Sequence, residues 1–126
     1  MEKESKTWAG GGELSIAGFI AWTADCYIGL TDFSTGVKAV KFSANGTGFM
    51  VGAVESELVG AFVVDPSTIG GSCHFIIEVI AGEEGAVSLG LYEKKGGTFY
   101  GSFTGPAEGI AAGVMKGKGK LVVKSS

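Results

Sequence analysis

Apolar residues alternate with polar or small residues in short runs along most of this chain. In the first clear run, Ser15 separates Leu14 from Ile16. A period of two places successive side chains on opposite faces of an extended strand, so the runs predict β-strands rather than helices. Their apolar positions are Leu14, Ile16, Cys26, Ile28, Leu30, Val40, Phe42, Phe49, Val51, Leu58, Phe62, Val64, Cys73, Phe75, Ile77, Val79, Val87, Leu89, Leu91, Phe99, Phe103, Leu121 and Val123.

The segments between these runs are short and rich in turn residues. Asn-Gly and Lys-Gly-Gly sequences supply the positive φ angles that tight hairpins require. Short connections join antiparallel neighbours, because parallel strands need long crossovers. The predicted turns are Ser34-Thr35-Gly36, Ala44-Asn45-Gly46, Asp65-Pro66-Ser67, Gly82-Glu83-Glu84-Gly85 and Lys94-Lys95-Gly96-Gly97.

Glycine is unusually frequent, at 23 of 126 residues, whereas the chain has two prolines. Glycine lacks the three-residue period of collagen here and is interleaved with Val, Ile and Phe, which indicates bulges, sharp bends and close backbone contacts. A small barrel has all three. We therefore predict an all-β fold, a small closed antiparallel β-barrel that forms a single domain over residues 12–124. Residues 1–11 are predicted to be a flexible N-terminal tail.

The net charge is −3, and lysine carries the positive charge. The chain as a whole has no bias towards nucleic acid or anionic membranes, and the bidentate guanidinium contacts that read phosphates and bases are not expected. The segment Met1–Lys6 is charged, so no signal peptide is expected. The uncharged stretch Leu14–Ala24 is much shorter than the roughly 20 residues of a membrane helix.

Two parts of the chain look alike when the sequence is shifted by 50 residues. The shift aligns Phe42 with Tyr92, Gly46 with Gly96 and Phe49 with Phe99. Chance similarity of two hairpins is the alternative, because hairpins share turn residues. If the repeat is real, the domain consists of two similar four-stranded units, and eight strands close into a barrel that side chains can fill. The repeat also places both Phe49 and Phe99 in the core.

The second half of the chain resembles the virulence-associated (Vap) proteins of rhodococci. The resemblance is carried by an apolar strand ending in an aromatic residue (Val87–Tyr92), a Gly-Gly hairpin with an aromatic-x-Gly strand (Gly96–Gly101) and a closing segment dense in glycine (Gly105–Gly119). The first half fits more loosely, at Gly18-Phe19-Ile20 and Val40-Lys41-Phe42.

This resemblance implies an eight-stranded antiparallel barrel of two similar Greek-key-like halves, with a packed core. It also implies a non-enzymatic factor that is directed at host or other target cells and acts on their membranes or proteins. The family has no catalytic motif to transfer. The segment Met1–Lys6 differs from the family's secretion signal and polar leader. The sequence therefore leaves the localisation open, with secretion implied only by the resemblance.

The residues themselves indicate no enzyme and no cofactor. His74 is the only histidine, so a metal pair with Cys73 would need two further ligands from elsewhere. Glu83 and Glu84 with Glu93, and Glu55 and Glu57 with Asp65, form loose acidic groups that are typical of solvated turns rather than of a glycosidase cleft. We therefore predict no catalytic, cofactor-binding or metal-ligating residues.

The sharpest charge pattern is Lys116-Gly117-Lys118-Gly119-Lys120, with Lys124 farther along. On a strand, the period of two places Lys116, Lys118, Lys120 and Lys124 on one face, where they could meet lipid phosphates. The alternative is that lysines on a terminal strand prevent edge-to-edge aggregation. These four lysines are the candidate contact surface.

Two further predictions concern the cysteines and the exposed aromatic side chains that a binding module would need. Cys26 and Cys73 are expected to be free buried thiols, because nothing in the sequence argues for an oxidising compartment. The alternative function is a small carbohydrate- or lipid-binding barrel, lectin- or lipocalin-like. Its candidate aromatic platforms are Trp8, Trp22, Tyr27 and Tyr100.

Overall fold

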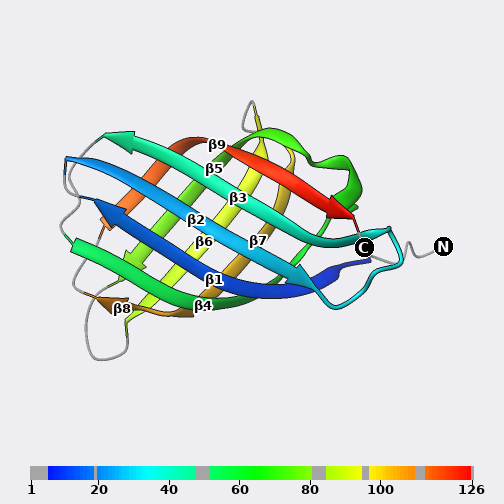
Figure 1. The fold of residues 1–126 in the computed structure, drawn as a ribbon, viewed down its shortest axis with the longest axis horizontal. Coiled ribbons are helices and arrows are strands. Elements are labelled where there is room, and N and C mark those ends of the chain that lie inside the picture. The colour runs from blue at the N-terminus through cyan, green and yellow to red at the C-terminus, as the bar shows by residue number, and fades with distance from the viewer. Residues whose placement is uncertain are drawn as a thin grey trace.

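In the computed structural model, residues 6–18, 20–47, 52–80, 85–94, 97–109 and 113–125 are described. They form an antiparallel sheet that closes on itself (Figure 1). The strands are β1 (Trp8–Gly18), β2 (Ala21–Leu30), β3 (Val37–Thr47), β4 (Gly52–Phe62), β5 (Gly71–Ile80), β6 (Ala86–Glu93), β7 (Phe99–Pro106), the short β8 (Glu108–Gly109) and β9 (Gly113–Ser125). A 3-10 turn, η1 (Pro66–Thr68), precedes β5.

The order of strands around the barrel is β4-β1-β2-β3-β9-β5-β6-β7, and the pairing of β7 with β4 closes the ring. The short β8 adds two residues beside β4. Every pairing is antiparallel, so the predicted closed antiparallel barrel is confirmed.

The barrel consists of two Greek-key halves, as the resemblance implied. In each half, three consecutive strands lie side by side and the fourth returns beside the first, which gives the spatial order 4-1-2-3. The first half is β4-β1-β2-β3 and the second is β9-β5-β6-β7. The two halves meet where β3 pairs with β9 and where β4 pairs with β7.

The 50-residue repeat, in contrast, is wrong. It equates β3 with β6 and β4 with β7, whereas the topology equates β1 with β5, β2 with β6, β3 with β7 and β4 with β9. β6 and β7 are neighbours in the sheet, but β3 and β4 are not. Phe99 is 39% exposed rather than buried. Phe49 lies outside the described residues, as do Lys95 and Gly96.

The predicted turn at Asn45-Gly46 is also wrong, because both residues lie inside β3. Asn45 pairs with Thr23 of β2, and Gly46 pairs with Trp22. A Cβ atom at Gly46 would lie 2.7 Å from the Trp22 ring, so this glycine makes room for a core side chain. The turn at Ser34–Gly36 is present, and Gly36 has the positive φ of 81° expected there.

The interior is filled by the inward-facing residues of the strands, as alternation predicted. On β5, for example, Cys73, Phe75, Ile77 and Val79 are all buried. Aromatic rings meet edge to face, with ring centres 5.3 Å apart for Phe42 and Phe75. The largest fully buried side chains are Phe42, Phe62, Phe75, Phe103, Leu14, Ile16, Ile28, Leu58, Ile77, Leu89, Leu91 and Leu121.

The first strand begins at Trp8, inside the segment 1–11 that the sequence suggested was a tail. Residues 8–11 pair with β4, and Gly10 and Gly11 also pair with β2, so they belong to the barrel. Lys6 holds the segment before them, because its Nζ lies 5.5 Å from the centre of the Trp8 ring and 3.7 Å from Oδ2 of Asp32. Residues 1–5 lie outside the described part of the chain.

Candidate functional site: the lysine surface and the adjoining groove

The four lysines singled out in the sequence lie on the outer face of β9. Lys116, Lys118, Lys120 and Lys124 are all exposed, whereas Met115 before them and Leu121 after Lys120 are buried. The alternation of the strand thus places the ammonium groups along one side, as predicted. We call the outer face formed by these four lysines the lysine surface.

The glycines within the lysine run have a packing role inside the barrel. A Cβ atom at Gly119 would lie 2.7 Å from Cε1 of Phe42, and one at Gly117 would lie 3.9 Å from Cε1 of Phe75. The Phe42 ring therefore occupies the space that a side chain at Gly119 would need, whereas Gly117 is favoured by its positive φ of 155°. Neither reason explains the lysines on the opposite face.

β9 is not an edge strand, although it is the last strand of the chain. It pairs with β3 from Gly119 to Ser125 and with β5 from Gly113 to Leu121. β9 is paired on both sides only from Gly119 to Leu121, so Lys120 lies at no open edge, whereas Lys116 and Lys118 pair with β5 alone. For these two lysines, protection against edge-to-edge association stays an alternative.

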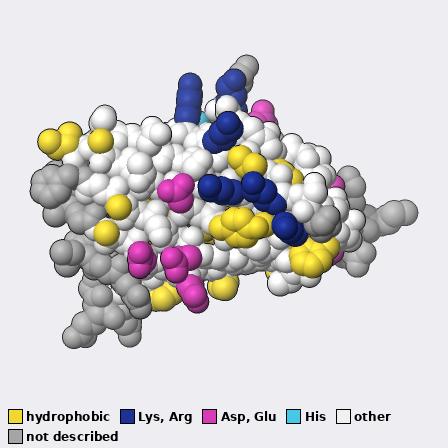
Figure 2. All heavy atoms as spheres, viewed as in Figure 1, with side chains coloured by type: hydrophobic (Ala, Val, Ile, Leu, Met, Phe, Trp, Pro, Cys, Tyr) yellow, Lys and Arg dark blue, Asp and Glu magenta, His cyan; other side chains and the backbone are white. Residues whose placement is uncertain are grey.

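The structure adds a lysine that the sequence interpretation missed. Lys41 of β3 is exposed and lies directly opposite Val122, which stands between Lys120 and Lys124 on the outer face of β9. On its other side, Lys41 is opposite Tyr27 of β2, which is 49% exposed. In Figure 2, lysine side chains gather on this face with apolar side chains between them. Lys41 could not be found from spacing, because the pairing of β3 with β9 joins residues far apart in the sequence.

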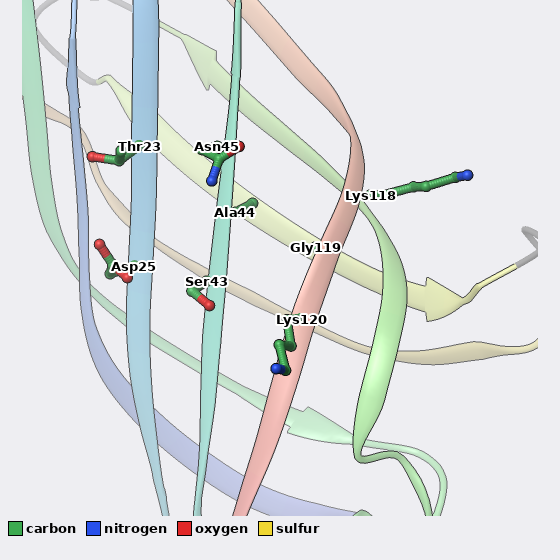
Figure 3. Close-up of a pocket in the computed structure, with 8 residues that line it drawn as sticks. All are labelled: Thr23, Asp25, Ser43, Ala44, Asn45, Lys118, Gly119 and Lys120. Carbon is green, nitrogen blue, oxygen red and sulfur yellow. The ribbon is translucent and has the colours of Figure 1, made fainter.

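An open polar groove of about 380 Å³ adjoins the lysine surface across β2, β3 and β9. Asp25 of β2 lies opposite Ser43 of β3, and Ser43 lies opposite Lys120 of β9. These three side chains form one row across the strands (Figure 3), whereas Lys118 points away towards β5. The groove is lined by Thr23, Asp25, Ser43, Ala44, Asn45, Lys118, Gly119 and Lys120.

Acidic residues gather on the neighbouring strands β1 and β4. Glu13 lies directly opposite Glu57, and Glu55 is exposed next to them along β4. Like charges in opposite positions destabilise a sheet, so this arrangement is not explained by stability. Among the described residues the ion pair of Lys6 with Asp32 is the only one, so the acidic side chains and the lysine surface remain separate (Figure 2).

Asp65 does not join Glu55 and Glu57 in a shared group. It caps η1, where its Oδ1 accepts hydrogen bonds from the backbone N and the Oγ of Ser67, at 2.8 and 2.7 Å. These bonds favour the carboxylate and lower the pKa of Asp65. Its role is local, at the start of the turn. Glu83 and Glu84 lie outside the described residues.

His74 is half-buried on the outer face of β5. Its Nδ1 lies 3.1 Å from the carbonyl oxygen of Lys94, and its cross-strand neighbours are Lys118 and Tyr92. Within the described part of the chain, no three His, Cys, Asp or Glu side chains come together as metal ligands would.

Both cysteines are free and buried, as predicted. Burial raises the pKa of Cys26 to about 12 and that of Cys73 to about 11, so both are neutral thiols at physiological pH. Of the four candidate aromatic platforms, Trp8 and Trp22 are buried, Tyr100 is half-buried and Tyr27 is exposed.

No helix in the described ranges is both long enough and apolar enough to cross a bilayer.

No family model and no curated protein matches this sequence. A solved structure does match: that of the virulence-associated protein VapD from the intracellular pathogen Rhodococcus equi. The TM-score is 0.71 at 14% sequence identity, and the match covers 95% of this chain and 100% of the VapD chain. The resemblance is therefore confirmed at the level of the fold, and this chain has the Vap-type β-barrel.

Proposed function

We propose that this protein is a non-catalytic interaction factor of the Vap type, which acts at the membrane of a host or other target cell through its lysine surface. Two observations support the proposal. The fold is shared over nearly the whole chain with a virulence-associated protein of an intracellular pathogen. The interior is filled by apolar side chains, which leaves the outer surface as the place for recognition.

The observation that carries the membrane part is the row of exposed lysines along the outer face of β9. Alternate residues of a strand are about 7 Å apart, so the ammonium groups can each meet a lipid phosphate. Each lysine near an anionic membrane surface contributes about 1 kcal/mol, and Lys41 adds to the four lysines of β9. Tyr27 and Val122 lie among these lysines, where an exposed aromatic and an aliphatic side chain can contact the headgroup region.

Sedimentation with vesicles of phosphatidylglycerol and phosphatidylcholine tests this proposal. The wild-type protein should bind at low salt and bind more weakly at moderate salt, because the attraction is screened. The triple variant Lys116→Gln, Lys118→Gln, Lys120→Gln should lose binding and keep its thermal midpoint, since all three side chains are exposed. If the wild type ignores anionic vesicles, or if the triple variant binds equally well, the membrane proposal fails.

The small carbohydrate- or lipid-binding module stays a prediction. A carrier of that kind should enclose its ligand in an apolar cavity of at least about 300 Å³. The hollows found over the described residues lie on the outer surface and are lined largely by polar or acidic side chains and glycine. This observation favours a surface contact over an enclosed ligand.

A further inference from the structure

The polar groove beside the lysine surface carries opposite charges at its two sides. Asp25 and Lys120 are two strands apart, with Ser43 between them, so their backbones are separated by about 10 Å. Both side chains are exposed, and no ion pair neutralises either of them within the described residues. The hollow of about 380 Å³ over this row is therefore dipolar, with an anionic wall on β2 and a cationic wall on β9.

The polar side chains along the groove supply hydrogen bonds to both ends of a ligand. The Ser43 hydroxyl lies between the two charges and can donate to a phosphate oxygen beside Lys120. Thr23 of β2 and Asn45 of β3 are cross-strand partners that line the groove and can accept hydrogen bonds from an ammonium group. No described hydrogen bond uses the side chains of Thr23, Asp25, Ser43 or Asn45.

A molecule that satisfies this groove has an ammonium group and a phosphate joined by a short link. We infer that the groove binds the headgroup of phosphatidylethanolamine, with the phosphate at Lys120 and the primary ammonium at Asp25. A choline headgroup is a poorer match, because quaternary ammonium groups are recognised by aromatic faces and the groove-lining residues include no aromatic ring. The inference rests on the proposed function, since Lys120 belongs to both the groove and the lysine surface, and it gives that surface a specific lipid.

The soluble probe is glycerophosphoethanolamine, titrated into the isotopically labelled protein and followed by amide chemical shifts. The largest shifts should occur at Asp25, Ser43 and Lys120. Asp25→Asn and Lys120→Gln should each weaken binding by about tenfold, because each removes one charge-assisted contact. Lys116→Gln is the matched control: it removes the same charge from the same strand, but Lys116 does not line the groove. Glycerophosphocholine should bind more weakly than glycerophosphoethanolamine.

Vesicles test whether the groove binds the ethanolamine headgroup within a membrane as well as its free analogue in solution. Adding phosphatidylethanolamine to phosphatidylcholine vesicles should increase binding of the wild type and of Lys116→Gln, but not of Asp25→Asn. On phosphatidylglycerol vesicles, Asp25→Asn should instead bind more tightly than the wild type, because it removes a negative charge beside the lysine surface. This opposite response of one variant to the two lipids is specific to a dipolar groove.

The outcomes distinguish the two proposals. If the wild type binds phosphatidylglycerol vesicles but neither glycerophosphoethanolamine nor ethanolamine lipid, the groove inference is overturned and the lysine surface stands. If it binds the ethanolamine probes but ignores phosphatidylglycerol, the groove stands and the anionic-membrane proposal fails. The groove inference is also overturned if Lys116→Gln weakens probe binding as much as Lys120→Gln, if the choline probe binds equally well, or if only the soluble probe binds.

Discussion

Gly119 of β9 lies against the ring of Phe42 on the neighbouring strand β3. A Cβ atom at Gly119 would be 2.7 Å from Cε1 of Phe42 and 3.1 Å from the carbonyl oxygen of Ser43. Phe42 is fully buried and meets Phe75 edge to face, so its ring has little room to move. The contact lies at the seam between the two Greek-key halves, where β3 pairs with β9.

We therefore expect Gly119→Ala to destabilise the protein by about 1–3 kcal/mol, the usual cost of overpacking a core. Urea unfolding followed by tryptophan fluorescence measures the change. Gly29→Ala is the control, because a Cβ atom there would have its nearest neighbour at 3.8 Å. The control should be neutral or slightly stabilising. Equal midpoints for the two variants would contradict the close contact at Gly119.

The two phenylalanines of β7 should differ strongly in their contribution to stability. Phe103 is fully buried with its ring centre 5.0 Å from that of Phe62, so Phe103→Ala should cost about 3–5 kcal/mol. Phe99 is 39% exposed and contacts Tyr92 at 5.3 Å, so Phe99→Ala should cost at most about 1.5 kcal/mol. Chemical denaturation measures both. If Phe99→Ala lowers the free energy of unfolding as much as Phe103→Ala does, Phe99 is packed in the core, as the sequence repeat suggested.

The alternation of apolar and polar residues predicted the strands well. It failed where the identity of a residue depends on a side chain of another strand. Alternation identified the inward face of β5 and the outward face of β9, because both depend only on the extended backbone. Gly46 looked like a turn residue, yet it is small because the Trp22 ring of another strand covers it. Such a contact leaves no signal in the nearby sequence.

The candidate site was predictable only in part, for the same reason. The four lysines of β9 follow from one strand, so spacing alone found them. Lys41 and Asp25 join them through the pairing of β3 with β9 and of β2 with β3. These pairings follow from the Greek-key order of strands, which the residues alone did not specify.

The buried thiols predict a loss of stability at alkaline pH. Burial raises the pKa of Cys26 from 9.0 to about 12 and that of Cys73 from 9.0 to about 11. Above pH 9 the unfolded chain releases these protons while the folded chain retains them, so the free energy of unfolding falls as pH rises from 9 towards 11 and 12.

Urea unfolding at a series of pH values from 8 to 11 measures this slope. The double variant Cys26→Ala, Cys73→Ala is the control, and its stability should depend less on pH even if it is lower throughout. A thiol reagent at pH 8 should label the wild type only after denaturant is added. Rapid labelling of the folded protein, or identical slopes for the two proteins, would contradict the buried positions.

Lys41 should contribute to membrane binding as much as a lysine of β9, although it is far from them in the sequence. It lies opposite Val122, between Lys120 and Lys124, with Tyr27 on its other side. Lys41→Gln should therefore weaken binding to phosphatidylglycerol vesicles by the same factor as Lys116→Gln, about fivefold for a contribution near 1 kcal/mol. Lys94→Gln is the matched control, because Lys94 is exposed but follows β6 at the turn towards β7 and belongs to neither β3 nor β9. Vesicle sedimentation at low salt compares the three variants. Equal losses for Lys41→Gln and Lys94→Gln would mean that net charge alone governs binding, and the surface across β3 and β9 would then have no particular role.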